Sequence, residues 1–164
     1  MRQLSGLTVC RDNLRKIGSS LALYARVSGG ELPVSPTMEN PHIELISGLA
    51  AEKFTGDPTS YYCPSEHRPN LSYSEQNFRA GIIGYYYYCA LNRSADPVLS
   101  KFLRDGALWP RRIKIGMSPK TWVMSDMWVS SLPTAHAGYK KGVNYLMLDG
   151  SVGFVTESPR RQFR

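Results

Sequence analysis

The sequence has no long apolar run. Its 164 residues are 42% hydrophobic, which is ordinary for a globular protein. No stretch approaches the roughly 18 to 20 consecutive apolar residues needed to cross a bilayer. Residues 1–8 are too few and too polar to act as a signal peptide. The composition therefore predicts a soluble chain that buries one core of its own, as a single domain of this length can.

Acidic residues are scarce relative to basic ones. The chain carries 13 Asp and Glu against 20 Lys and Arg, which gives a net charge of +7. Basic residues cluster at Arg111-Arg112, Lys140-Lys141 and Arg160-Arg161. A solvated basic surface with a cationic tail is the favoured interpretation, and attraction to DNA, anionic lipid or an acidic polysaccharide is the alternative. No known nucleic-acid motif accompanies the charge, so DNA binding is the less favoured outcome.

Cysteine is also scarce, and its three positions form no zinc motif with closely spaced pairs. Cys63 and Cys89 each end a tyrosine-rich segment that we expect to be extended, so they are candidates for neighbours in one sheet. We predict that they form a disulfide in an oxidising compartment. Cys10 would remain a buried free thiol. Three cysteines allow three pairings, so the other two remain open.

Catalytic signatures are missing. The sequence has no nucleophile elbow, phosphate-binding loop, dinucleotide fingerprint or calcium loop. The best polar set is His136, Asp126 and Asp149, whose imidazole and carboxylates could bind a divalent ion. The favoured alternative is that Asp149 shapes a turn, Asp126 ends a strand and His136 bonds to loop backbone. We therefore predict no catalytic residue, no metal and no cofactor.

An amphipathic helix is predicted near the N-terminus, from about Leu4 to Val27. Gly29-Gly30 would end this helix, and Pro33 would prevent it from resuming. Apolar side chains recur at steps of three and four, which places them on one stripe. The stripe consists of Leu7, Cys10, Leu14, Ile17, Leu21, Tyr24 and Ala25.

A sheet is predicted in the rest of the chain. Asp149-Gly150 is a favoured dipeptide for a two-residue type I′ turn, and it would join the last two strands as a hairpin. A shorter strand is expected at Tyr61–Cys63, and short helices at 42–54 and 96–105. The main strands are expected at Gly84–Ala90, Thr121–Asp126, Val143–Leu148 and Ser151–Thr156. A long helix followed by antiparallel strands predicts the α+β class.

The tyrosine run in the first main strand has two possible roles. Tyr85 and Tyr87 would lie on one face of this strand, with Tyr86 and Tyr88 on the other. One set would enter the core. The other set would face solvent, where it could stack on a sugar or a partner protein.

Three segments together resemble pseudopilin-like proteins that carry a prepilin-type, processing-associated C-terminal domain. The first runs from Cys10 through Asn13-Leu14 to Ile17-Gly18. The second is Cys63-Pro64-Ser65-Glu66. The third begins at His136 and continues from Asn144 to Asp149-Gly150 and Val152. Their order matches the family, although the interval from His136 to Asp149 is longer here and Ser151 stands where the family has a second histidine.

The resemblance implies a pilin-like fold, with an amphipathic N-terminal helix packed on an antiparallel sheet. Residues 1–30 would be the C-terminal part of the pilin-like helix. Residues 31–164 would be a globular head with a C-terminal hairpin, in one domain overall. It also implies that Met1 marks a trimmed start, because the family has an apolar membrane anchor upstream.

The implied role is that of a structural subunit or assembly factor of a type II secretion or type IV pilus-like system. Its partners would be other pilin-like subunits and assembly proteins. Its place would be the periplasmic face of the inner membrane or an extracellular filament. Two alternatives remain: an extracytoplasmic carbohydrate- or ligand-binding domain, and a metal-dependent hydrolase that uses His136, Asp126 and Asp149.

Overall fold

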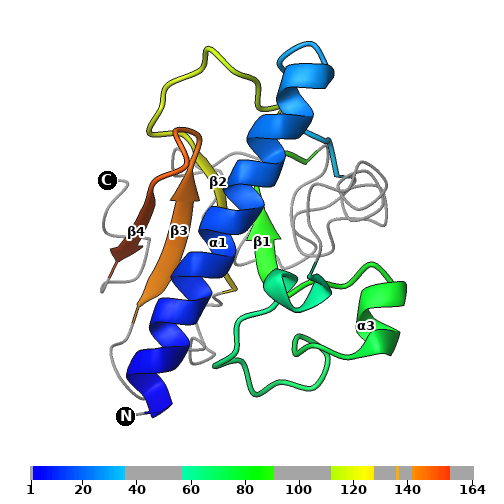
Figure 1. The fold of residues 1–164 in the computed structure, drawn as a ribbon, viewed down its shortest axis with the longest axis vertical. Coiled ribbons are helices and arrows are strands. Elements are labelled where there is room, and N and C mark those ends of the chain that lie inside the picture. The colour runs from blue at the N-terminus through cyan, green and yellow to red at the C-terminus, as the bar shows by residue number, and fades with distance from the viewer. Residues whose placement is uncertain (1, 36–56, 91–111, 128–135, 137–141, 156–164) are drawn as a thin grey trace, which may run out of the picture.

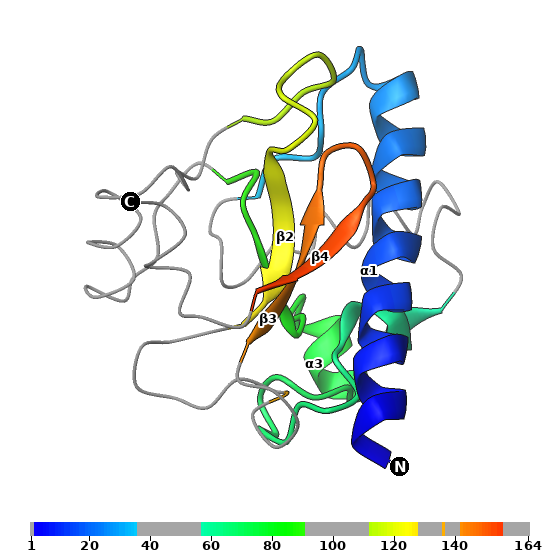
Figure 2. The same ribbon diagram turned by 90° about the vertical axis from the view of Figure 1, so that its left-hand side faces the viewer.

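A long helix lies across one face of a small antiparallel sheet (Figures 1 and 2). The computed structural model describes residues 2–35, 57–90, 112–127, 136 and 142–155. Strands β1 to β4 pair in sequence order, and every pairing is antiparallel. The predicted α+β class is confirmed. The elements are α1 (Arg2–Val27), η1 (Pro58–Tyr61), α3 (Glu75–Arg79), β1 (Tyr85–Tyr87), β2 (Trp122–Asp126), β3 (Val143–Met147) and β4 (Val152–Val155).

Helix α1 forms where the periodicity predicts it. The core of its apolar stripe is buried against the sheet, at Cys10, Leu14, Ile17, Leu21 and Ala25. A Cβ added at Gly18 would lie 2.9 Å from Cδ1 of Leu146, so glycine lets the helix approach β3 closely. The helix ends as predicted. Gly29 and Gly30 have φ values of 66° and 86°, a conformation in which glycine commonly terminates helices.

The tyrosine run is buried on both faces of β1. The Tyr85 hydroxyl lies 3.5 Å from Cys10 Sγ, which places the odd-numbered set toward α1. On the other face, the Tyr88 hydroxyl lies 2.8 Å from Ser125 Oγ. All four of Tyr85, Tyr86, Tyr87 and Tyr88 are buried. The prediction that one set of tyrosines faces solvent is therefore wrong, because the side chains on both faces of β1 are buried.

The β3–β4 hairpin forms as predicted, but its turn is of another type. The Met147 amide donates to the Ser151 carbonyl, and the Gly150 amide donates to the Met147 carbonyl, both at 2.9 Å. The loop therefore has three residues, 148–150, and Gly150 follows the central pair with φ 83°. This is the pattern of a type I turn followed by a left-handed residue. The predicted two-residue type I′ turn is wrong.

The substitution Gly150→Val is expected to destabilise the hairpin. A Cβ there meets no atom within 4 Å, so the cost comes only from forcing a β-branched residue to positive φ, about 1 to 3 kcal/mol. Calorimetry should show a melting temperature lower by about 2 to 12 °C. Gly150→Asn is the control, because asparagine tolerates this conformation, and it should lose much less. Equal melting temperatures for the two variants would contradict this account of the turn.

The segment before Cys63 is helical rather than extended. Asp57 Oδ1 accepts a 2.9 Å hydrogen bond from the Thr59 amide, and this cap starts the short 3-10 helix η1. The predicted strand at Tyr61–Cys63 is therefore wrong. Helix α3 follows in the same part of the chain and is capped by the Ser74 side chain. The helices predicted at 42–54 and 96–105 lie outside the described residues.

No helix in the described part of the chain combines the length and apolar character that crossing a membrane requires.

Candidate metal centre

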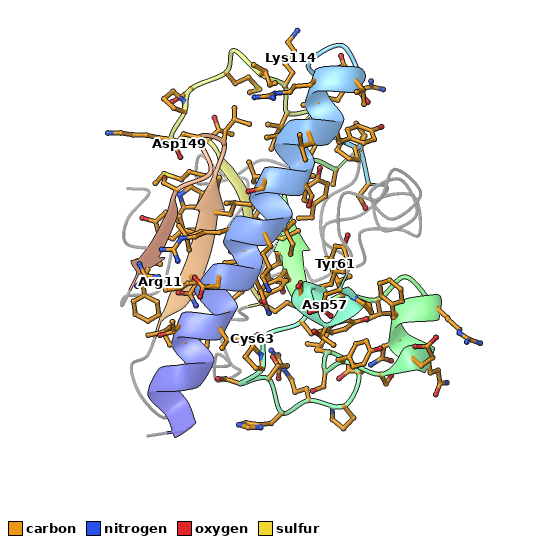
Figure 3. The ribbon with its side chains drawn as sticks, viewed as in Figure 1. Arg11, Asp57, Tyr61, Cys63, Lys114 and Asp149 are labelled. Atoms are coloured by element: carbon orange, nitrogen blue, oxygen red, sulfur yellow. The ribbon has the colours of Figure 1, made fainter. Side chains whose placement is uncertain are left out.

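Four potential metal ligands meet in the interior between α1 and the sheet. They are Cys10 on α1, Cys63 after η1, Asp126 at the end of β2, and His136. One ligand atom from each lies within 4.8 Å of every other, and all four residues are buried. Figure 3 shows Cys63 beside the N-terminal half of α1. Positions far apart in the sequence thus form one cluster.

Local structure explains how these residues meet. Cys10 lies on the buried stripe of α1. One turn further on, Asn13 Nδ2 donates a 3.1 Å hydrogen bond to the Tyr62 carbonyl, which holds the Cys63 segment against the helix. Asp126 is the last residue of β2 and pairs in register with Tyr85 of β1. The cluster therefore joins the helix, the η1 segment and the sheet.

The polar atoms of the cluster converge on one another. The Cys10 thiol donates to Asp126 Oδ1 at 3.0 Å. His136 Nε2 lies 3.4 Å from Cys63 Sγ and 3.4 Å from Asp126 Oδ2. The same histidine nitrogen therefore faces both a sulfur and a carboxylate oxygen.

Asn144 of β3 fixes the carboxylate. Its backbone amide donates to Asp126 Oδ2 at 2.7 Å, and its side-chain Nδ2 donates to the same oxygen at 2.9 Å. Asn144 Nδ2 also lies 3.5 Å from Cys10 Sγ. Asn144 Oδ1 is buried and has no hydrogen-bond partner. This asparagine explains how a carboxylate is held inside an otherwise apolar sheet face.

Burial and mutual contacts shift the ionisation of the cluster. Burial raises the pKa of Asp126 and raises the pKa of Cys10 well above its usual value. Hydrogen bonding from Cys10, with help from His136, lowers the pKa of Cys63 to about 7. Burial alone would lower the pKa of His136, but the hydrogen bond to Cys63 and the charge of Asp126 raise it instead. Cys63 is therefore the thiol that ionises more readily.

These donors could hold a transition metal. Two sulfurs, an imidazole nitrogen and a carboxylate oxygen make a four-ligand set of the kind found in structural zinc sites. The same two sulfurs could instead form a disulfide between α1 and the η1 segment, since both are free thiols in the structure.

The predicted polar set is brought together only in part. Asp126 and His136 do meet, at 3.4 Å. Asp149 is exposed in the hairpin loop, where its Oδ1 accepts hydrogen bonds from the Ser151 amide and hydroxyl. Figure 3 places Asp149 far from Cys63. Asp149 therefore shapes the turn, as the favoured interpretation has it.

The predicted Cys63–Cys89 disulfide is not present, because both residues are free thiols. Cys89 Sγ instead accepts a 3.2 Å hydrogen bond from the Ile113 amide. Cys10 is buried, as predicted, but it belongs to the cluster rather than only to the core. The sequence thus did not indicate Cys10, Cys63 and Asn144 as site residues. The signal that could have indicated the site is a polar residue within an apolar strand, as at Asn144 and Asp126.

Comparisons with known protein families, curated proteins and solved structures gave no match to this chain.

Proposed function

We propose that this chain is the head of a pseudopilin-like exported protein that acts as a structural subunit or assembly factor. The observation that carries the proposal is a helix much longer than the sheet that it covers. In this account an apolar segment upstream of Met1 anchors the helix in a membrane. The other pilin-like subunits and the secretion or pilus assembly proteins are its partners.

The lengths of the elements support this role. Helix α1 has 26 residues, which span about 39 Å at 1.5 Å per residue. The strands have three to five residues, or about 10 to 17 Å. Covering the sheet therefore requires only part of the helix. Its N-terminus lies at one end of the long axis of the described part (Figure 1), where an upstream segment would extend away from the head.

The outer face of α1 supports packing against a neighbour. Val9, Leu23 and Val27 are 46%, 43% and 70% exposed. The sequence separations between these residues are close to whole numbers of helical turns. Their side chains therefore lie within about 40° of one another around the helix axis. The exposed Lys16 lies between Val9 and Leu23 at nearly the same angle. The continuous apolar part of this face is therefore Leu23 and Val27, one turn apart. Helices of adjacent subunits in a filament would cover this short stripe.

The two rival functions have weaker support. A hydrolytic metal keeps an open coordination position, whereas the four buried donors of the cluster are all contributed by protein. A sugar-binding platform needs exposed rings, and the tyrosines of β1 are buried. A structural role, without catalysis, is the better explanation of both features.

The substitution Leu23→Glu is expected to disrupt assembly of the full-length protein in its native cells. A charge placed in the stripe would have to be desolvated against the neighbouring subunit. We expect the assembled fraction, measured by sedimentation of sheared cell-surface material and immunoblotting, to fall about tenfold or more, the equivalent of about 1.4 kcal/mol.

Ala22→Glu is the matched control, because Ala22 is exposed on the same helix but about 100° away around the axis from Leu23. It should assemble like the wild type. Both variants should keep the wild-type melting temperature. Undiminished assembly of Leu23→Glu would contradict the proposed packing.

A further inference from the structure

We propose that Cys10, Cys63, Asp126 and His136 bind one Zn²⁺ ion that ties α1 to the sheet. The site would be structural, with all four ligands supplied by the protein. This inference does not depend on the proposed function, since a zinc ion could stabilise the same head in any role.

The spacing of the ligand atoms fits a tetrahedral ion. Zinc bonds of about 2.0 to 2.3 Å place neighbouring ligand atoms about 3.3 to 3.8 Å apart. His136 Nε2 lies 3.4 Å from Cys63 Sγ and from Asp126 Oδ2. The Cys10 Sγ to Asp126 Oδ1 distance of 3.0 Å is shorter, and a small side-chain rotation would open it. All four ligand atoms lie within 4.8 Å of one another, about 1 Å more than the widest separation around a tetrahedral zinc ion, so closing the site requires movements of about that size.

The histidine contact is longer than a good hydrogen bond. Such bonds join nitrogen and oxygen at about 2.7 to 3.2 Å, whereas His136 Nε2 and Asp126 Oδ2 are 3.4 Å apart. The same nitrogen also lies 3.4 Å from Cys63 Sγ, so it faces the sulfur and the carboxylate oxygen at equal distances. Ligand atoms arranged around a shared ion have this relation.

The chemistry of the donors selects zinc over other common cations. Two sulfurs and an imidazole are poor ligands for Mg²⁺ and Ca²⁺, which prefer oxygen, and suit Zn²⁺ well. Charge also favours a cation here. Asp126 is fully buried, and among the ion pairs of the described residues its only partner is His136. A divalent ion would offset two of the three negative charges that the carboxylate and both thiolates would carry.

The surroundings of the ligands also fit a metal site. Metal-bound carboxylates are usually held by hydrogen bonds from an outer layer of residues. Asn144 provides two such bonds to Asp126 Oδ2, at 2.7 and 2.9 Å. Asp126 is thereby oriented before any ion binds.

Titration with zinc alone tests the proposal. The protein is reduced with a phosphine, stripped with a chelator, and titrated with Zn²⁺ while its melting temperature and bound metal are measured. We expect one equivalent to bind and the melting temperature to rise with zinc concentration. Co²⁺ in place of Zn²⁺ should give the intense absorption of thiolate-to-cobalt charge transfer.

Cysteine variants locate the ion. Cys63→Ser should weaken zinc binding by at least about 100-fold, more than the loss of an outer-layer partner usually costs. Cys89→Ser is the matched control, because Cys89 is also a buried free thiol but lies outside the cluster. It should bind zinc like the wild type. If Cys63→Ser does not fold, the cobalt spectrum of the wild type still shows whether thiolates bind the metal ion.

Three results would overturn the proposal. The first is reduced wild type that binds no zinc, or that binds cobalt without thiolate absorption. The second is Cys63→Ser that binds zinc as tightly as Cys89→Ser. The third is protein isolated from its native cells with a Cys10–Cys63 peptide lighter by two hydrogens and with no metal. That peptide would show that a disulfide, not an ion, joins α1 to the η1 segment.

Discussion

Leu14→Ala is expected to lower the free energy of unfolding by about 2 to 5 kcal/mol. Leu14 is 0% exposed and belongs to the hydrophobic core that α1 shares with the sheet. Truncation removes apolar burial and leaves a cavity that the surrounding strands cannot fill. Chemical denaturation should show the loss directly. The melting temperature should fall by about 4 to 20 °C.

Leu23→Ala is the control for this truncation. It makes the same chemical change on the same helix, but Leu23 is 43% exposed, and surface changes of this kind usually cost no more than about 0.5 kcal/mol. Similar losses for the two variants would mean that α1 does not pack on the sheet through the Leu14 face.

Tyr88→Ala is expected to cost about 3 to 5 kcal/mol, the range typical of large buried side chains. Its ring packs edge-on against Trp122 with centroids 6.3 Å apart, and the residue is 2% exposed. The change should be as damaging as Tyr87→Ala on the opposite face. Denaturant unfolding, read by far-UV circular dichroism, measures both.

Tyr88→Phe separates the ring from the hydroxyl. It keeps the packing and loses the 2.8 Å contact with Ser125 Oγ, so it should cost about 1 kcal/mol. A loss below about 0.5 kcal/mol for Tyr88→Ala would contradict the burial of this face. Such a small loss would instead favour the alternative in which these tyrosines are exposed and bind a ligand.

The helix and the sheet were predictable because their signals are local. The three- and four-residue spacing from Cys10 to Ala25 indicates one buried stripe, and Gly29-Gly30 marks where it stops. The four strands were likewise found from their apolar and β-branched runs. The type of the turn was not predictable, because the Asp149-Gly150 dipeptide fits both two-residue and three-residue loops. Only the cross-strand hydrogen bonds of Met147 decide between them.

The cluster was not predictable in full, because its members are brought together only by the tertiary fold. Asp126 and His136 were found, since polar groups beside apolar strands stand out. Cys10 looked like one more apolar residue of the helix stripe. Cys63 was assigned to a strand and paired with Cys89, whereas Asp57 and Pro58 start a 3-10 helix there. The alternation of tyrosines likewise gave no information on whether the second face of the sheet is covered.

The mature N-terminus of the protein in its native cells is the most direct test of the pseudopilin proposal. The full-length protein would be recovered from membrane and cell-surface fractions and its first peptide identified by mass spectrometry. We expect an apolar segment that runs directly into α1 and begins at a prepilin-type cleavage site, which resembles Gly-Phe-Thr-Leu-Ile-Glu. A mature chain that starts at Met1 and is recovered from the cytoplasm would contradict the proposal.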